Sequence, residues 1–232
     1  MEQLVFELAA PELPCLANFL PGRNAELLAV LPAFIDGRHN ATGLLLWGAP
    51  ASGKSHLLAA AVALARERGL AARYVAHPRD IADDAIGADT LMAIDRIEEA
   101  DAAGAGRMFT LFNALQERNG RMIAATRSPL ATLPLREDLR TRLGWGLVYE
   151  VFALADEDKS TALGAYAKER GFALSGDIIE YLLRHGRRDM RSLLATLAAL
   201  DRRSLATKRP ITVPMIKDWL QQELEWERRA NG

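Results

Sequence analysis

The segment that most restricts the fold is Gly48–Ser55, which fits the phosphate-binding loop pattern G-x-x-x-x-G-K-[ST] at every required position. The apolar run 43–47 before it predicts a buried strand, and residues 56–68 after it predict a helix. In this strand–loop–helix context, backbone amides and a helix N-terminus attract phosphate. A chance match in a Gly/Ala-rich loop is the alternative, and the two correct flanks weigh against it. The chain is therefore expected to bind a nucleoside phosphate.

A nucleotide site needs more than the loop. Lys54 can reach the β- and γ-phosphates, and Ser55 can hold Mg²⁺. A second metal ligand is expected at the end of a neighbouring strand, and the apolar run Thr90–Ile94 leads directly into Asp95. The alternative for Asp95 is a solvated acid that simply ends a strand. Arg96 follows it, where many ATPases of this build carry a second acid that activates water, so binding is better supported than turnover.

Composition excludes several classes of protein. The 232 residues include 29 Lys and Arg against 30 Asp and Glu, and a net charge of -1 argues against a protein that grips nucleic acid mainly by charge. A single cysteine allows no internal disulfide, which fits a reducing cytosol. The N-terminus has no basic, signal-like region, and no apolar run reaches the length of a membrane span. We expect a cytoplasmic protein with no membrane partner.

Short apolar runs alternate with helical patterns over the first two thirds of the chain. Residues 55–68 and 107–119 are predicted helices, each followed by a glycine suited to a C-cap. The predicted strands are Leu44–Trp47, Arg73–Ala76, Thr90–Ile94, Met122–Thr126 and Leu147–Val151. Such alternation predicts an α/β fold with a parallel five-stranded sheet flanked by helices.

After about Leu154 the strand patterns stop. Asp156, Ser175 and Asp189 are candidate caps of three helices, and residues 212–214 open a fourth. The sequence thus predicts three parts: an N-terminal arm (1–14), an α/β nucleotide-binding domain (15–154) and a small all-helical lid domain (155–232).

Several polar residues stand where they can touch a nucleotide, each with a plainer alternative. Thr126 ends an apolar strand and can sense a γ-phosphate, or it simply begins a turn. Arg140 and Arg142 lie two apart on a predicted helix, so one can join a salt network while the other reaches outward. On local sequence alone, ordinary surface solvation is the favoured explanation for both arginines. The cluster of Arg187, Arg188 and Arg191 can sense phosphates from a helix start or form a solvated patch.

In this order the motifs resemble the AAA+ ATPase family and, within it, the DnaA branch. The resemblance spans residues from about 15 to 228. It is carried by Asn18–Asn24, Gly48–Leu58, Ile94-Asp95, Leu139–Leu147 and Met190-Arg191. DnaA itself continues into a C-terminal helix-turn-helix domain, which this sequence does not include. The layout is similar to that of the regulatory inactivators of DnaA.

The resemblance implies roles for individual residues. Asp95 and Ser55 would hold Mg²⁺, Thr126 would be sensor 1, Arg191 would be sensor 2, and Arg142 would be an arginine finger acting on a partner's nucleotide. Contacts with ADP or ATP would come from Asn18, Phe19, Pro21, Gly48, Ala51, Ser52, Gly53, Lys54, Ser55, His56 and Arg191.

The N-terminal hexapeptide resembles the short motif by which such regulators bind the replicative sliding clamp, the β subunit of DNA polymerase III. Its anchors would be Gln3, Leu4, Phe6 and Leu8. The alternative is that these apolar residues pack on the protein's own domain as an edge strand. The implied partners are DnaA and the clamp, with DNA reached only through the clamp and self-association as a further option.

The resemblance thus implies a regulator that stimulates hydrolysis of DnaA-bound ATP and prevents over-initiation of chromosome replication. A second hypothesis is a self-sufficient AAA+ ATPase acting as a helicase-loader-like or DnaA-like replication factor, against which Arg96 argues. A third is a DNA-binding initiator fragment, which the near-neutral charge disfavours.

Overall fold

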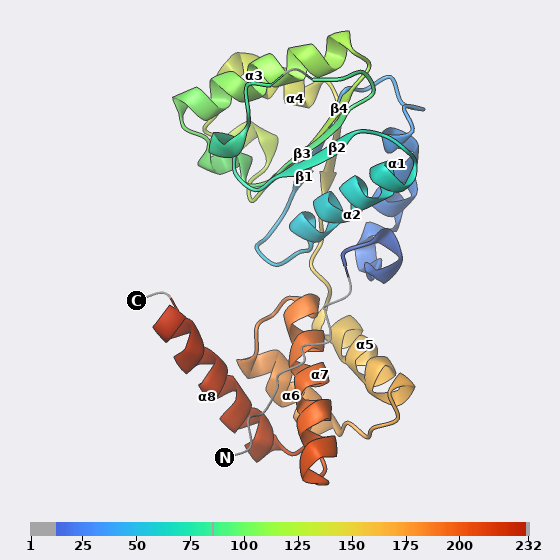
Figure 1. Cartoon of the computed structure of the whole chain (residues 1–232), viewed down its shortest axis with the longest axis vertical. Helices are drawn as coiled ribbons and strands as arrows, with labels where there is room; N and C mark the ends of the chain where they lie inside the picture. The colour runs from blue at the N-terminus through green and yellow to red at the C-terminus, as the bar shows by residue number, and fades with distance from the viewer. Residues whose placement is uncertain (1–12, 85, 231–232) are drawn as a thin grey trace. The chain divides into compact units, whose positions relative to one another are not determined.

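The computed structural model describes residues 13–84 and 86–230. Their contacts divide them into two compact units, residues 13–153 and residues 154–230. The first unit combines a sheet with helices, and the second is entirely helical (Figure 1). Among the described residues, no helix is long and apolar enough to cross a membrane.

The first unit is built on one parallel sheet with strand order β2-β3-β4-β1-β5. Its strands are β1 (Gly43–Trp47), β2 (Ala72–Val75), β3 (Leu91–Ile94), β4 (Arg121–Thr126) and β5 (Leu147–Glu150). Because every strand runs the same way, all five carboxyl ends meet at one edge of the sheet. Ligands of open α/β sheets bind outside that edge. The loop that follows β1, an inner strand between β4 and β5, therefore lies where a ligand is expected.

The predicted fold, a five-stranded parallel sheet with flanking helices and a helical lid, is confirmed. Each predicted strand is present, with ends that differ by at most one residue from the predicted ones. Differences of this size arise from fraying and from the way strand ends are defined.

Four α-helices cover the sheet: α1 (Ala25–Ile35), α2 (Lys54–Glu67), α3 (Ala102–Glu117) and α4 (Glu137–Gly144). The sequence reading did not include α1, whose buried face is Leu27, Leu31, Phe34 and Ile35. Pro32 lies inside this helix. It has no backbone N–H and removes one helical hydrogen bond, yet the helix continues through it.

The start of α3 was predicted five residues too late. It begins at Ala102, and Asp101 caps it by accepting a hydrogen bond from the Gly104 amide at 2.6 Å. The Ala/Gly-rich first turn shows no apolar period, so the cap was the only local signal of this start.

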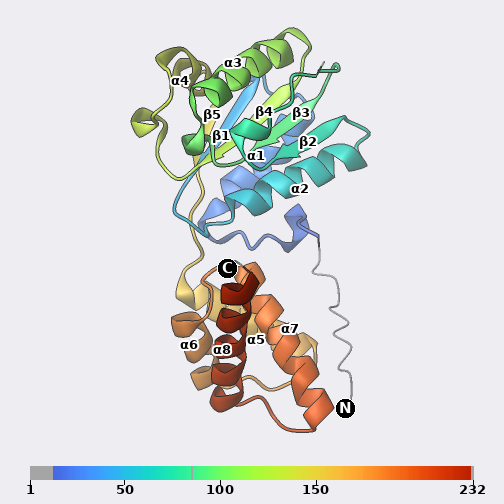
Figure 2. The ribbon, with the colours of Figure 1, turned by 60° about the vertical axis from the view of Figure 1, so that its left-hand side comes forward.

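Alternate residues of the strands face opposite sides of the sheet and feed two apolar layers. On β1, Leu44 and Leu46 point toward α1 and α2, whereas Leu45 points toward α3 and α4. Figure 2 shows the two helix pairs on the two faces. With both faces covered, the inner strands β1, β3 and β4 are buried and mostly apolar, as is typical of parallel sheets, whereas the edge strands β2 and β5 carry exposed polar residues.

The second unit is a bundle of α5 (Asp156–Glu169), α6 (Gly176–His185), α7 (Met190–Thr207) and α8 (Val213–Ala230). Leucines and isoleucines of all four helices and the loop before α8 form its core, among them Leu163, Leu182, Leu197 and Ile216. Helix α7 begins as predicted, since Asp189 accepts a hydrogen bond from the Ser192 amide at 2.9 Å.

Two of the other predicted caps behave differently. Ser175 stands at the N-cap position of α6, but its side chain makes no capping hydrogen bond. The prediction for Asp156 was wrong: Ala155 is the N-cap of α5, and Asp156 is its first helical residue. There the Asp156 carboxylate pairs with Lys159 at 3.1 Å and with Arg188 at 3.0 Å.

Candidate nucleotide-binding site

The loop after β1 turns sharply before entering α2. Ala51 adopts a left-handed conformation with φ 61°, and Gly48 has φ 158°. A Cβ at Gly48 would lie 2.4 Å from the carbonyl oxygen of Val151, so only glycine fits there. The backbone therefore takes the tight path that a phosphate-wrapping loop requires.

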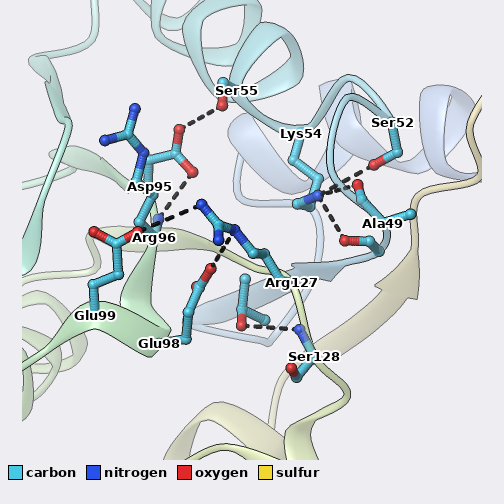
Figure 3. A network of polar contacts seen from close by, with 12 residues as sticks. Ala49, Ser52, Lys54, Ser55, Asp95, Arg96, Glu98, Glu99, Arg127 and Ser128 are labelled. Carbon is cyan, nitrogen blue, oxygen red and sulfur yellow. Dashed lines mark hydrogen bonds and ion pairs between the residues drawn. The ribbon is translucent and has the colours of Figure 1, made fainter. Parts of the chain in front are cut away.

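Lys54, the first residue of α2, is turned into this loop and is only 8% exposed. Its Nζ donates hydrogen bonds to the carbonyls of Gly48 (2.7 Å) and Ala49 (2.8 Å) and lies 3.2 Å from Ser52 Oγ (Figure 3). Burial lowers the pKa of Lys54 below its usual value, while the negative charges of Asp95 and Glu98 act in the opposite direction.

Asp95 follows β3 and lies opposite the start of α2. It is 3% exposed, and its Oδ2 accepts hydrogen bonds from Ser55 Oγ at 2.5 Å and from the Tyr74 hydroxyl at 2.9 Å. Ser55 and Asp95 thus present two oxygen ligands side by side, the donor type that Mg²⁺ prefers. Their chemistry would fit a magnesium ion, which would supply positive charge beside a bound phosphate.

Tyr74 is a site residue that the sequence reading missed. It lies on β2, next to β3 in the sheet, and its hydroxyl reaches Asp95 from that neighbouring strand. Burial, followed by the charge of Asp95 and the hydrogen bond to it, raises the pKa of Tyr74 to about 12. A polar residue near the end of a predicted strand was its only signal, and pairing of the strands was needed to give it meaning.

Arg96, which follows Asp95, takes part in a chain of polar contacts. Its backbone is left-handed (φ 52°), and its guanidinium lies 2.6 Å from His77 Nε2. The Nδ1 atom of His77 lies 3.2 Å from the Glu99 carboxylate. An arginine donating to Nε2 requires the proton on Nδ1, so this ring links Arg96 to Glu99.

Arg127 forms ion pairs with Glu98 and Glu99, the two acids that follow Asp95 most closely in the sequence. Its Nε lies 3.3 Å from Glu98 and its Nη2 lies 3.6 Å from Glu99, as Figure 3 shows. Both carboxylate oxygens of Glu98 are buried and lack a hydrogen-bond partner among the described residues.

Thr126, just before Arg127, is 1% exposed, and its Oγ1 accepts from the Ser128 amide at 3.3 Å.

Arg142 lies in the last turn of α4. Its guanidinium carbon is 4.6 Å from the centre of the Phe109 ring and 5.7 Å from that of the Trp145 ring. Within the described chain neither Arg140 nor Arg142 forms a side-chain ion pair, so the option of a salt network is not seen there. The Asp138 carboxylate of α4 pairs with Arg136 at 2.7 Å.

Comparison with known proteins bears on both units. Residues 156–220 match the family model described as Hda, lid domain. Domain III of the replication initiation protein DnaA from Thermotoga maritima is similar over 90% of this chain and 95% of its own, with 16% identity and a TM-score of 0.70. The second unit thus matches the Hda lid family, and the chain shares the fold of DnaA domain III.

Two further structures extend this likeness of fold. AMPPCP-bound DnaA from Aquifex aeolicus has 21% identity, a TM-score of 0.65, and coverage of 81% of this chain and 65% of its own. The Thermotoga maritima RuvB R170A variant has 15% identity, a TM-score of 0.66, and coverage of 90% and 71%. The chain spans 64–67% of the length of the first three initiator structures that it matches.

Of the residues expected to contact ADP or ATP, Phe19 lies closest to the loop in the segment before α1. This ring packs against Gly53 of the loop, with its centre 5.6 Å from that of the His56 ring. Asn18 is used in its own turn, accepting from the Cys15 amide at 3.0 Å and donating to the Leu13 carbonyl at 3.1 Å. Pro21 is exposed. Phe19 and His56 are therefore the residues of this group that lie against the loop.

Asn24 is a buried residue whose structural role could not be read from the sequence. It is 3% exposed, donates to the Phe152 carbonyl at 2.9 Å and accepts from the Phe152 amide at 2.8 Å. These two bonds tie the segment around Phe19 to the chain just after β5, and Arg23 stacks 3.8 Å above the Phe152 ring. The segment before α1 is thereby fixed beside the loop.

Arg191 belongs to the lid, where it is exposed at the second position of α7. Among the described residues, no ion pair of its side chain is present, whereas Arg188 pairs with Asp156. All four predicted clamp-binding residues lie outside the described residues: Gln3, Leu4, Phe6 and Leu8.

Proposed function

We propose that this Hda-like chain is a regulatory AAA+ protein that binds adenine nucleotide and the sliding clamp and stimulates hydrolysis of DnaA-bound ATP. It would thereby prevent over-initiation of chromosome replication. The observation that carries the proposal is an Hda-type lid on a DnaA-like AAA+ fold. The charged residues of the first unit support a division of labour between two sites.

The first site would hold ADP or ATP. Phosphate oxygens would replace the loop carbonyls as acceptors for Lys54, and Phe19 and His56 would border the base. Ser55 and Asp95 would hold Mg²⁺, which neutralises phosphate charge when bound. The AMPPCP-bound initiator structures support the choice of an adenine nucleotide.

Weak hydrolysis at this first site follows from its acids. Arg96 occupies the position after Asp95 where an acid would activate water, and it contacts His77 instead. Glu98 and Glu99, the nearest substitutes, are both paired with Arg127. We therefore assign this nucleotide mainly a structural role.

The second site would lie on DnaA, with Arg142 completing it. An arginine finger neutralises charge that develops on the transferred phosphoryl group. Arg142 suits this role because, within the described chain, no carboxylate neutralises its charge. A salt-bridged arginine would first have to break that bond.

Hydrolysis assays test the proposal. The purified chain should hydrolyse ATP slowly alone and should accelerate hydrolysis by ATP-loaded DnaA when clamp loaded on DNA is present. Equal turnover with and without DnaA would favour the self-sufficient ATPase instead. Unchanged DnaA-bound ATP in the complete mixture would contradict the proposal.

The clamp contact has its own test. An extended peptide that buries Leu4 and Phe6 in an apolar groove binds with modest affinity, on the order of micromolar, because ordering it costs entropy. Replacing Gln3, Leu4 and Phe6 together with alanine should abolish clamp capture and leave ADP binding unchanged. A lowered melting temperature, with no capture by the wild type either, would instead indicate that these residues pack on their own domain.

A further inference from the structure

The last turn of α4 couples Arg142 to Trp145. Trp145 follows Arg142 by three residues and is the C-cap residue of the helix. Its backbone N–H donates to the carbonyls of Thr141 at 3.1 Å and Arg142 at 3.2 Å. Residues three apart on a helix share a face, so the indole is carried past the Arg142 side chain by the helix itself.

The chain on both sides of this turn is fixed. Leu139 and Leu143 of α4 are buried, at 0% and 1% exposure, and anchor the helix on the apolar layer below it. Gly146 passes so close to β1 that a Cβ there would lie 2.0 Å from the Gly43 carbonyl oxygen. The backbone that carries Arg142 and Trp145 therefore has little freedom to shift.

Two rings contact the guanidinium from two elements. Phe109 belongs to α3, is partly buried against the same apolar layer, and lies 4.6 Å from the Arg142 guanidinium carbon. Trp145 lies 5.7 Å from it and remains 67% exposed. Cations at these distances from ring centres are attracted by the ring quadrupole.

Stacking on rings differs from salt bridging in its effect on reactivity. Rings orient the planar guanidinium but leave its N–H donors and its charge available for an anion. They also remove rotamer freedom that a long side chain would otherwise lose on binding. A large exposed indole beside the cation is otherwise an unfavourable use of surface, since it keeps apolar area in water.

We propose that Phe109 and Trp145 are positioning residues that hold Arg142 in a preset orientation for the phosphates of a partner's ATP. This inference rests on the proposed function, in which Arg142 is the arginine finger. It adds that the maximal rate of stimulated hydrolysis depends on the two rings.

The test measures stimulated hydrolysis by DnaA against the concentration of the full chain, with clamp loaded on DNA. Phe109→Leu and Trp145→Ala should each lower the maximal rate by about 2- to 30-fold, the range that cation–π stabilisation supports, and leave the half-saturating concentration unchanged. Trp145→Phe should restore most of the rate because it restores a ring. Arg142→Lys should not, because an ammonium keeps the charge but loses the planar stacking.

Melting curves of each variant test whether the fold is retained, and Phe109→Tyr, which keeps the ring, is the matched control and should retain the rate. If Phe109→Leu is unstable, Trp145→Ala at the exposed indole carries the test. A Trp145→Ala protein with an unchanged maximal rate but a raised half-saturating concentration would make the indole a docking contact and overturn the inference. Wild-type rates in both ring variants, beside a lost rate in Arg142→Ala, would overturn the inference alone. An unaffected Arg142→Ala protein would overturn the proposed function with it.

Discussion

Cations are paired differently in two regions of the molecule: the corner of the candidate nucleotide site, formed by Lys54, Asp95 and Arg127, and the end of α4 around Arg142. At the corner, Lys54 is buried among acceptors of its own loop, and Arg127 is shared between two glutamates. At the end of α4, Arg142 rests on two rings, and no carboxylate of the described chain pairs with it. The first region satisfies its charges internally, and the second keeps one available.

This difference indicates what each region can do. Buried polar groups must be paired, so a closed network such as that of Asp95, Ser55 and Tyr74 accepts a ligand only by exchanging partners. A cation held by aromatic contacts can meet an external anion without first losing a partner. The corner is thus suited to retaining a nucleotide, and the α4 end is suited to acting on another one.

The largest effect is expected from Arg142→Ala. Arginine fingers contribute about 10³–10⁵ in rate, so stimulation of DnaA should be almost abolished while nucleotide and clamp binding persist. Arg140→Ala is the matched control from the same helix and should matter much less. Stimulation within about threefold of wild type is too small on that scale and would return Arg142 to ordinary surface charge.

Lys54→Ala should have the next largest effect, on binding rather than on stimulated rate alone. Charged hydrogen bonds contribute about 1.5–3 kcal/mol each, so ADP and ATP should bind about 10- to 150-fold more weakly in calorimetry. The fold should persist, because the lysine bonds only to loop atoms. Thermal stability should fall only as far as bound nucleotide stabilises the wild type. Unchanged affinity would remove the loop from the site.

Arg127→Gln should show how much the ion pair between Arg127 and Glu98 contributes to the free energy of unfolding. It leaves the Glu98 carboxylate, whose side chain is 15% exposed, without its ion pair. Since Arg127 is itself 58% exposed, we expect a loss of about 1–2 kcal/mol in the free energy of unfolding. Denaturant melts measure this loss, and adding Glu98→Gln should recover most of it. No loss in the single variant would mean that the pairing is incidental.

The smallest effect is expected from Tyr74→Phe. Removing one hydrogen bond to Asp95 should change Mg²⁺-dependent nucleotide affinity by a few fold, about 1 kcal/mol. Because the folded-state pKa is raised to about 12, the stabilising contribution of Tyr74 is complete below about pH 10 and is lost as the pH rises toward 12. Tyrosinate absorbance near pH 10.5 should therefore be equal in both proteins. A higher absorbance in the wild type would contradict the raised pKa.

Much of the fold was predictable because its signals are local. The apolar runs that became β1, β3 and β4 are buried on both faces, so their sequences are apolar without interruption. Asp189 capped its helix as predicted, since a cap involves residues three apart. Helix α1 was not predicted because Pro32 lies inside it, and proline disfavours a helix interior. Burial of Leu31 and Phe34 outweighs that local preference.

The candidate site was predictable only in part. The loop from Gly48 to Ser55 and the acid Asp95 follow from motif and spacing, because phosphate and magnesium chemistry demand these residue types in that order. The partners of these residues depended on which strands lie side by side. Tyr74 reaches Asp95 because β2 pairs with β3, a long-range choice with no local signature.

The sequence by itself thus determined the order of the strands, the phosphate loop, the helical lid and the presence of arginines at 127 and 142. Only the tertiary structure decided that Arg127 is paired with Glu98 and Glu99 while Arg142 stacks on Phe109. Backbone propensity and periodicity act between near neighbours. The partner of a long charged side chain is set by which distant segments the packed core brings within a few ångströms of it.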